Sequence, residues 1–174
     1  PTGVFDKRMS STMNCFETIT DRKLRFAVVG CGRIAKNHFA SLAQHKDRVE
    51  LVGVCDINPA ALAEAAEATG ATPYRDLRSL LESCPADVVV LTTPSGLHPD
   101  PAVQVAESGR HVMTEKPMAT RWQDGKRMVS ACDAAGGRLF VVNQNRCNRT
   151  LQLPKPAVQK VRLVGSSLLI SSES

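Results

Sequence analysis

The stretch FAVVGCGRIAKNHFA, residues 26–40, decides the fold of this chain. It begins as a continuous apolar run, passes through two glycines, and continues with the apolar spacing that is typical of a helix. A G-x-G-x-x-A pattern at Gly30, Gly32 and Ala35 therefore lies between a predicted strand and a predicted helix, the context that a phosphate-binding turn requires. In that context Gly30 permits the tight turn, Gly32 lets a pyrophosphate approach the backbone, and Ala35 lets helix and strand pack closely.

The predicted site continues beyond this turn. We expect the N–H groups at the start of the helix, at Arg33 and Ile34, to meet the phosphate, with Arg33 adding a positive charge. The next apolar run ends in Asp56, 26 residues after Gly30 and near the offset of about 20 at which a carboxylate accepts a ribose 2′-hydroxyl. Because a carboxylate there repels the 2′-phosphate of NADP, we predict NAD. The alternative is that Asp56 only caps the turn DINP.

The rest of the chain repeats the alternation of strand and helix. Apolar runs predict strands at 24–29, 49–55, 87–93, 111–115 and 138–144. Helices are predicted at 31–45, 58–70, 74–83 with an entry at Asp76, 98–109, and 120–137 with Thr120 as N-cap and Gly136 as stop. Strands that are apolar on both faces and separated by helices predict an α/β protein with a doubly wound parallel sheet, the Rossmann arrangement.

Composition excludes several other classes. The 174 residues suffice for one ordinary domain, and the 22 basic and 17 acidic residues are interspersed, so we expect no nucleic-acid partner. No apolar run approaches the roughly 18 residues of a membrane span. The six cysteines lie scattered without metal-ligand spacing, so we interpret them as core residues of a cytoplasmic protein and predict no metal site.

Charged and polar residues follow two of the predicted strands where core residues would otherwise be expected. TTPSGLHP at 92–99 follows one strand and TEKP at 114–117 follows the next. Ligands of a doubly wound sheet sit beyond the carboxyl ends of its strands. Both segments are therefore predicted to face the same crevice as the glycine turn.

With these motifs the chain resembles the Gfo/Idh/MocA oxidoreductases. Within that family it is most similar to the UDP-N-acetylglucosaminuronate 3-dehydrogenases of lipopolysaccharide and O-antigen synthesis. The resemblance spans about residues 22–152 and is carried by GCGRIAKNH at 30–38, GVCD at 53–56, TPSGLH at 93–98, EKPMA at 115–119 and VVNQNR at 141–146.

The resemblance implies site residues beyond the glycine turn. Lys116 is expected to be catalytic, contacting cofactor and substrate from a cis bond before Pro117, with partial burial lowering its pKa. Its ammonium would stabilise negative charge on a carbinol oxygen as hydride leaves. Further cofactor contacts are implied at Thr93, Pro94, Ser95, Leu97, His98, Glu115 and Gln144. Asn145 and Arg146 are expected near the substrate, although surface solvation explains Arg146 equally well, and His38 and His111 are interpreted as structural.

We divide the chain into a disordered extension at 1–23, an NAD-binding Rossmann domain at 24–146, and an aberrant or truncated tail at 147–174. Relatives continue with a substrate domain that carries a catalytic histidine, and we expect that domain to be missing or truncated here. Where relatives have a helix, Pro154 and Pro156 would each cost about 3 kcal/mol in a helix interior.

The function that the resemblance implies is an NAD-dependent dehydrogenase that oxidises C3 of a nucleotide-linked sugar, with a possible homo-oligomer and no membrane partner. We expect little turnover from these 174 residues. The alternatives are a non-catalytic NAD-binding module and an inactive truncated product. Use of the same turn for another adenosyl ligand, such as S-adenosylmethionine, leaves Glu115, Lys116 and Pro117 unexplained.

Overall fold

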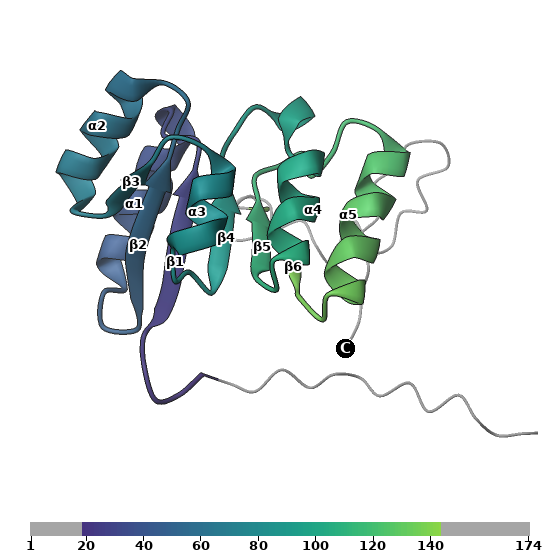
Figure 1. The fold of residues 1–174 in the computed structure, drawn as a ribbon, viewed down its shortest axis with the longest axis horizontal. Helices are drawn as coiled ribbons and strands as arrows, with labels where there is room; N and C mark the ends of the chain where they lie inside the picture. The colour runs from purple at the N-terminus through teal and green to yellow at the C-terminus, as the bar shows by residue number, and fades with distance from the viewer. Residues whose placement is uncertain (1–18, 144–174) are drawn as a thin grey trace, which may run out of the picture. The chain divides into compact units, whose positions relative to one another are not determined.

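A parallel sheet organises the described part of the chain. The computed structural model describes residues 19–143, in which six strands lie in the order β3-β2-β1-β4-β5-β6, with every neighbouring pair parallel (Figure 1). Because the order reverses between β1 and β4, the carboxyl ends of these strands are the place where a doubly wound sheet binds its ligand, and we refer to this place as the crevice. The strands are β1 Leu24–Val29, β2 Val49–Cys55, β3 Thr72–Tyr74, β4 Val88–Leu91, β5 His111–Thr114 and β6 Leu139–Val141.

Helices connect the strands and cover both faces of the sheet, which confirms the predicted doubly wound fold. The α-helices α3, α4 and α5 pack on one face, and α1 and α2 pack on the other (Figure 1). The helices are α1 Arg33–Gln44, α2 Pro59–Thr69, α3 Leu77–Ser83, the 3-10 turn η1 Ser95–Leu97, α4 Pro99–Glu107 and α5 Trp122–Ala134.

Strand residues alternate between the two cores. In β1, Ala27 and Val29 face α3, α4 and α5, whereas Phe26 and Val28 face α1. All four residues of β4 are buried, as expected for a central strand with helices on both sides. The two cores together fix β1 and β4, the strands that border the crevice.

Several helix ends follow from local chemistry. Asp76 begins α3 as predicted, with its carboxylate accepting a 2.7 Å hydrogen bond from the Ser79 amide. Asn58 caps α2 in the same way, and Gly136 follows α5 with a φ of 68°, as its predicted role as a stop requires.

Some boundary predictions were wrong, and one strand was missed. Helix α5 has Arg121 rather than Thr120 as its N-cap, because Arg121 is the extended residue next to the helix and no side chain bonds the cap position. The last strand is shorter than predicted and ends at Val141. The sequence did not single out β3, and the helix predicted at 74–83 wrongly included Tyr74, which ends that strand. The three residues Thr72–Tyr74 are too short to show a period and are strand only because they pair with β2.

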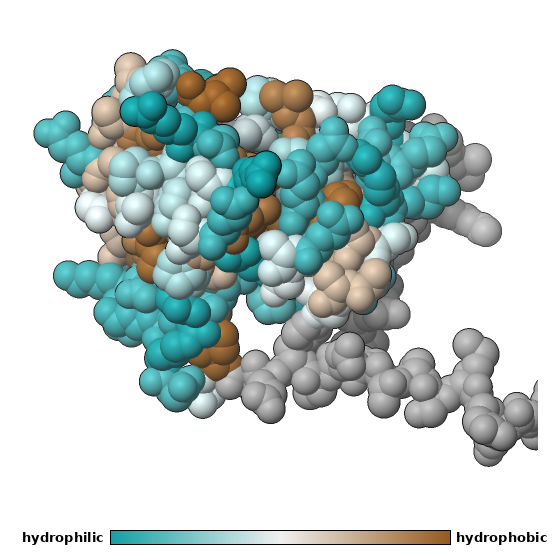
Figure 2. Space-filling view, in the orientation of Figure 1, coloured by the Kyte–Doolittle hydropathy of each residue, from teal (hydrophilic) through white to brown (hydrophobic). Residues whose placement is uncertain are grey.

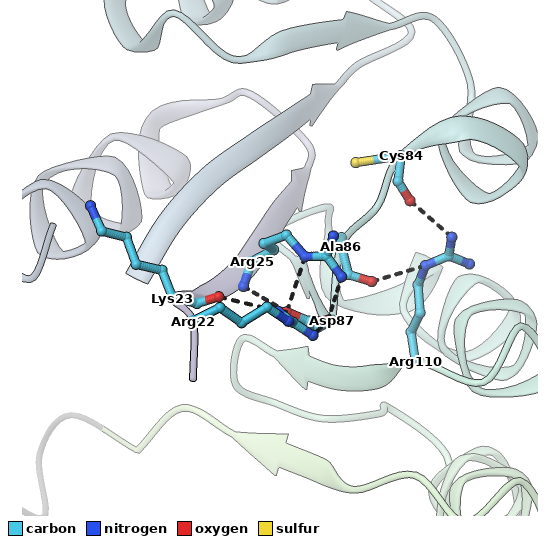
Figure 3. A network of polar contacts seen from close by, with 7 residues as sticks. All are labelled: Arg22, Lys23, Arg25, Cys84, Ala86, Asp87 and Arg110. Carbon is cyan, nitrogen blue, oxygen red and sulfur yellow. Dashed lines mark hydrogen bonds and ion pairs between the residues drawn. The ribbon is translucent and has the colours of Figure 1, made fainter. Parts of the chain in front are cut away.

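The amino edge of the sheet is held by a charged network around Asp87, which precedes β4 (Figure 3). Its carboxylate accepts hydrogen bonds from Arg22 at 2.6 and 2.9 Å and from the amide and guanidinium of Arg25 at 2.8 and 3.1 Å. Burial raises the pKa of Asp87, but these donors outweigh it and hold the pKa well below its usual range. Arg110 nearby donates to the carbonyl oxygens of Leu81, Cys84 and Ala86.

The cysteines in the described part of the chain are core residues, as predicted. Cys31, Cys55, Cys84 and Cys132 are buried free thiols. Burial raises the pKa of Cys31 to about 11 and that of Cys55 to about 12, so both stay protonated at neutral pH. Cys15 and Cys147 lie outside the described residues.

The surface agrees with the interspersed charges of the sequence. Hydrophilic residues cover most of the face that carries α3, α4 and α5, with only isolated hydrophobic residues between them (Figure 2). Between residues 19 and 143, no helix combines the length and apolarity needed to cross a bilayer. Over the same residues, no group of three potential metal ligands occurs.

Candidate cofactor-binding site

The glycine turn after β1 is packed against the loop after β4. Gly30 has a φ of 94°, and a Cβ at that position would lie 2.9 Å from the backbone nitrogen of Thr93. The hydroxyl of Thr92 donates a 2.6 Å hydrogen bond to the carbonyl oxygen of Gly30. Both the backbone conformation and the lack of space therefore require glycine at position 30.

The start of α1 is open to a ligand. Gly32 is the N-cap, no side chain bonds the cap position, and the first turn contains no acidic residue. A Cβ at Gly32 would meet nothing within 4 Å, and Arg33 and Ile34 beside it are exposed. Ala35 is fully buried, as its predicted packing role requires. Amides at a helix N-terminus that lack an acceptor favour an anion such as a phosphate.

Asp56 lies at the end of β2 and touches this turn. One carboxylate oxygen, Oδ2, accepts a 2.6 Å hydrogen bond from the amide of Cys31, and Oδ1 accepts a 2.8 Å bond from the amide of Asn58. Asp56 therefore does cap the DINP turn, which is the role that the alternative interpretation gave it. A carboxylate offers about four acceptor positions, so about two remain for ribose hydroxyls.

The loop after β4 is anchored by His98. The imidazole is completely buried, and its Nε2 donates a 2.7 Å hydrogen bond to the carbonyl oxygen of Thr93, an atom that can only accept. Between these two residues, Pro94 and Leu97 are exposed and Ser95 is half-buried. His98 thus holds the loop from inside, and a direct contact between His98 and the cofactor stays a prediction.

Glu115 and Lys116 follow β5 at the same edge. The amide of Glu115 donates to Leu91 at the end of β4, and its Oε1 accepts a 2.7 Å hydrogen bond from Nε2 of His38 in α1. The Lys116–Pro117 bond is cis, as the resemblance implied. Lys116 itself is exposed, so the expected partial burial is not present in the described part of the chain.

His38 lies against one of the predicted site residues. From the sequence we interpreted it as structural, and in the structure its Nε2 lies 2.7 Å from Oε1 of Glu115, with both side chains about 15% exposed. The signal in the sequence for this neighbourhood was its position in α1, the helix that follows the glycine turn.

The structure brings most of the predicted site together. The glycine turn, Asp56, the loop at Thr93, and Glu115 with Lys116 all lie at the carboxyl ends of β1, β2, β4 and β5 (Figure 1). Gln144, Asn145 and Arg146 lie outside the described residues. The uncapped start of α1 fits the pyrophosphate of a dinucleotide. The carboxylate of Asp56, which has acceptor positions left, fits one of its riboses.

Comparisons with known proteins agree with this geometry. Residues 24–143 match the family model GFO_IDH_MocA, described as an oxidoreductase family with an NAD-binding Rossmann fold. Inositol 2-dehydrogenase of Salmonella typhimurium is 34% identical over 122 residues, which are 68% of this chain and 36% of that protein.

Two solved structures are more similar in sequence. The WlbA dehydrogenase of Chromobacterium violaceum, crystallised with NADH and UDP-GlcNAcA, is 62% identical with a TM-score of 0.79, over 81% of this chain and 41% of that chain. The Bordetella pertussis WlbA dehydrogenase, also with NADH and UDP-GlcNAcA, is 63% identical with a TM-score of 0.77, over 79% and 43%. The chain thus spans about two fifths of the length of these relatives.

The match over residues 24–143 covers more than half of the chain, and it includes the glycine turn, Asp56 and the loop at Lys116. The predicted cofactor, NAD, agrees with the description of the matching family. The chain belongs to the Gfo/Idh/MocA family of oxidoreductases, whose cofactor-binding part is an NAD-binding Rossmann fold.

Proposed function

We propose that this chain is the cofactor-binding part of an NAD-dependent dehydrogenase of nucleotide-linked sugars. The substrate that we propose is a UDP-N-acetylhexosaminuronate, oxidised at C3 in lipopolysaccharide or O-antigen synthesis. Support comes from the identity of 62–63% to two WlbA dehydrogenases that were crystallised with UDP-GlcNAcA. The observation that carries the proposal is the convergence of the glycine turn, Asp56 and Glu115–Lys116 at one sheet edge.

Each predicted residue has a proposed role at that edge. Gly30, Gly32, Arg33 and Ile34 would bind the pyrophosphate, and Asp56 would accept the adenosine ribose hydroxyls. The nicotinamide half would lie toward Thr93, Pro94, Ser95, Leu97, His98, Glu115 and Gln144, with Asn145 and Arg146 toward the substrate. When bound, NAD supplies the hydride acceptor.

Lys116 would act on the substrate oxygen. Its ammonium donates hydrogen bonds and stabilises negative charge that develops on the carbinol oxygen during oxidation. The resemblance places a second proton-transfer group, a histidine, in the substrate domain. We expect substrate-dependent NADH formation to be abolished in Lys116→Met.

Calorimetric titration with NAD and NADP tests the cofactor assignment. We expect micromolar binding of NAD and weaker binding of NADP, because the carboxylate of Asp56 repels a 2′-phosphate. Binding of NAD should be lost in Gly32→Val, where the new side chain fills the space in which the phosphate would lie. If neither dinucleotide binds, the proposed function is wrong.

The second candidate is a non-catalytic NAD-binding module. The exposure of Lys116 favours it, because an ammonium in solvent behaves as an ordinary surface lysine. Absorbance of NADH in the presence of NAD and UDP-GlcNAcA separates the two candidates. A rate that depends on Lys116 supports the dehydrogenase, whereas NAD binding with no rate above the Lys116→Met background supports the module.

A further inference from the structure

His38 and Glu115 join two parts of the crevice that are far apart in the sequence. His38 lies in α1, the helix that directly follows the glycine turn. Glu115 follows β5, and β5 is the second strand from β1 in the sheet. Their side chains are 2.7 Å apart, between Nε2 and Oε1, and are 15% and 14% exposed. Because a carboxylate oxygen only accepts, the imidazole is the donor. The contact is therefore a charge-assisted hydrogen bond that water reaches only partly.

The second oxygen of the Glu115 carboxylate binds the backbone of Lys116. Oε2 of Glu115 accepts a 3.3 Å hydrogen bond from the backbone amide of Lys116, so both oxygens have a partner. The amide of Glu115 is also held, by the carbonyl oxygen of Leu91 at 3.1 Å. The orientation of the Glu115 carboxylate thus depends on a donor from α1, and the backbone at Lys116 depends on that carboxylate.

We propose that His38 is a positioning residue for the nicotinamide-ribose half of the cofactor. It holds Glu115 in the orientation that accepts a ribose hydroxyl, and through Glu115 it fixes the backbone from which Lys116 projects. The inference rests on the proposed NAD binding and adds a residue outside the predicted site. Because His38 already orients Glu115, less conformational entropy of the Glu115 side chain is lost when the ligand binds.

A comparison of two ligands tests this role. NAD contains the nicotinamide ribose, whereas ADP ends at the pyrophosphate and needs only the glycine turn and Asp56. In His38→Leu we expect the affinity for NAD, measured by calorimetry, to fall about tenfold, the scale of one lost hydrogen bond to a charged group. The affinity for ADP should not change.

A conservative variant separates positioning from packing. In His38→Gln the amide nitrogen can occupy the place of Nε2 and donate to Glu115, so most of the NAD affinity should return. Glu115→Ala should weaken NAD binding as His38→Leu does, and the double variant should be no weaker than Glu115→Ala alone. His45→Leu, at the exposed histidine that follows the same helix, is the matched control and should bind like the unaltered chain.

The outcomes are distinguishable. If His38→Leu weakens NAD and ADP equally, or leaves both unchanged, His38 does not position the nicotinamide half and the inference is overturned. The melting temperature of each variant shows whether a substitution acts through folding. Such a substitution would lower the affinity for both NAD and ADP, and His38→Gln would not restore it. If the unaltered chain binds ADP but not NAD, or binds neither, the proposed function fails first, and this inference fails with it.

Discussion

The backbone amide of Cys31 donates a 2.6 Å hydrogen bond to Oδ2 of Asp56, and this bond joins the glycine turn to the end of the neighbouring strand. The other oxygen of Asp56 is held by the amide of Asn58 at 2.8 Å. The carboxylate that is proposed to accept a ribose is therefore already oriented by the fold. Pre-oriented acceptors lose little conformational entropy when a ligand binds.

Replacement of Asp56 should affect both affinity and cofactor choice. Asp56→Ala removes the ribose acceptor and the partner of the Cys31 amide, so NAD affinity should fall at least tenfold, since hydrogen bonds to charged groups contribute about 1.5–3 kcal/mol. The ratio of NADP to NAD affinity should rise, because the repulsion of a 2′-phosphate is lost. Calorimetry with both dinucleotides measures this ratio. An unchanged ratio in Asp56→Ala would contradict the assignment of Asp56 to the ribose.

The two glycines of the turn should respond differently to alanine. Gly30→Ala forces a φ of 94° on a residue with a side chain and places its Cβ 2.9 Å from Thr93, so the free energy of unfolding should fall by about 1–3 kcal/mol. Gly32→Ala introduces a Cβ that meets no protein atom within 4 Å and should change stability by less than about 0.5 kcal/mol. It should still weaken NAD binding. Urea unfolding and titration of the two variants side by side test this contrast, and equal destabilisation would refute it.

His98 is expected to matter for stability and for the shape of the loop after β4. His98→Leu keeps the buried volume roughly constant but leaves the Thr93 carbonyl without its donor, which should cost about 1–3 kcal/mol of unfolding free energy. NAD affinity should fall as well, since Thr93 is packed against the glycine turn. Leu97→Ala is the control, because that neighbouring side chain is 61% exposed and its loss should change stability by less than about 0.5 kcal/mol. A His98→Leu variant as stable as Leu97→Ala would show that the buried bond contributes nothing.

Stability should fall in acid through Asp87. The pKa of this carboxyl is lowered in the folded chain, so its contribution is fully present above the unfolded pKa of about 3.9 and is lost as pH falls toward the folded value. Asp87→Asn should therefore be less stable than the unaltered chain at pH 7 and should lose less stability between about pH 5 and pH 3. Denaturant unfolding at these three pH values measures the difference. Parallel curves for the two proteins would indicate that Asp87 has an ordinary pKa.

Local patterns predicted the parts of the site that depend on neighbouring residues in the chain. The apolar run before Gly30 and the helical spacing after it placed the turn correctly, and Asp76 and Gly136 marked the helix ends that the structure shows. Patterns failed where pairing or packing decides. Residues Thr72–Tyr74 form a strand because they pair with β2. The N-cap of α5 is Arg121 and not Thr120, although a threonine side chain is the better capping group.

The sequence by itself determined the order of the helices and of every strand except β3, and it determined the glycine turn, because each of these follows from periodicity or from short spacing along the chain. The assignment of Asp56 to a ribose stays a prediction. Only the tertiary structure decided that the imidazole of His98 is buried against Thr93 and that His38 binds Glu115 across two strands. These contacts join residues whose proximity depends on the strand order and on the direction in which each side chain leaves its helix. That direction is fixed by packing of the whole sheet, and no pattern local to His38 or to Glu115 contains it.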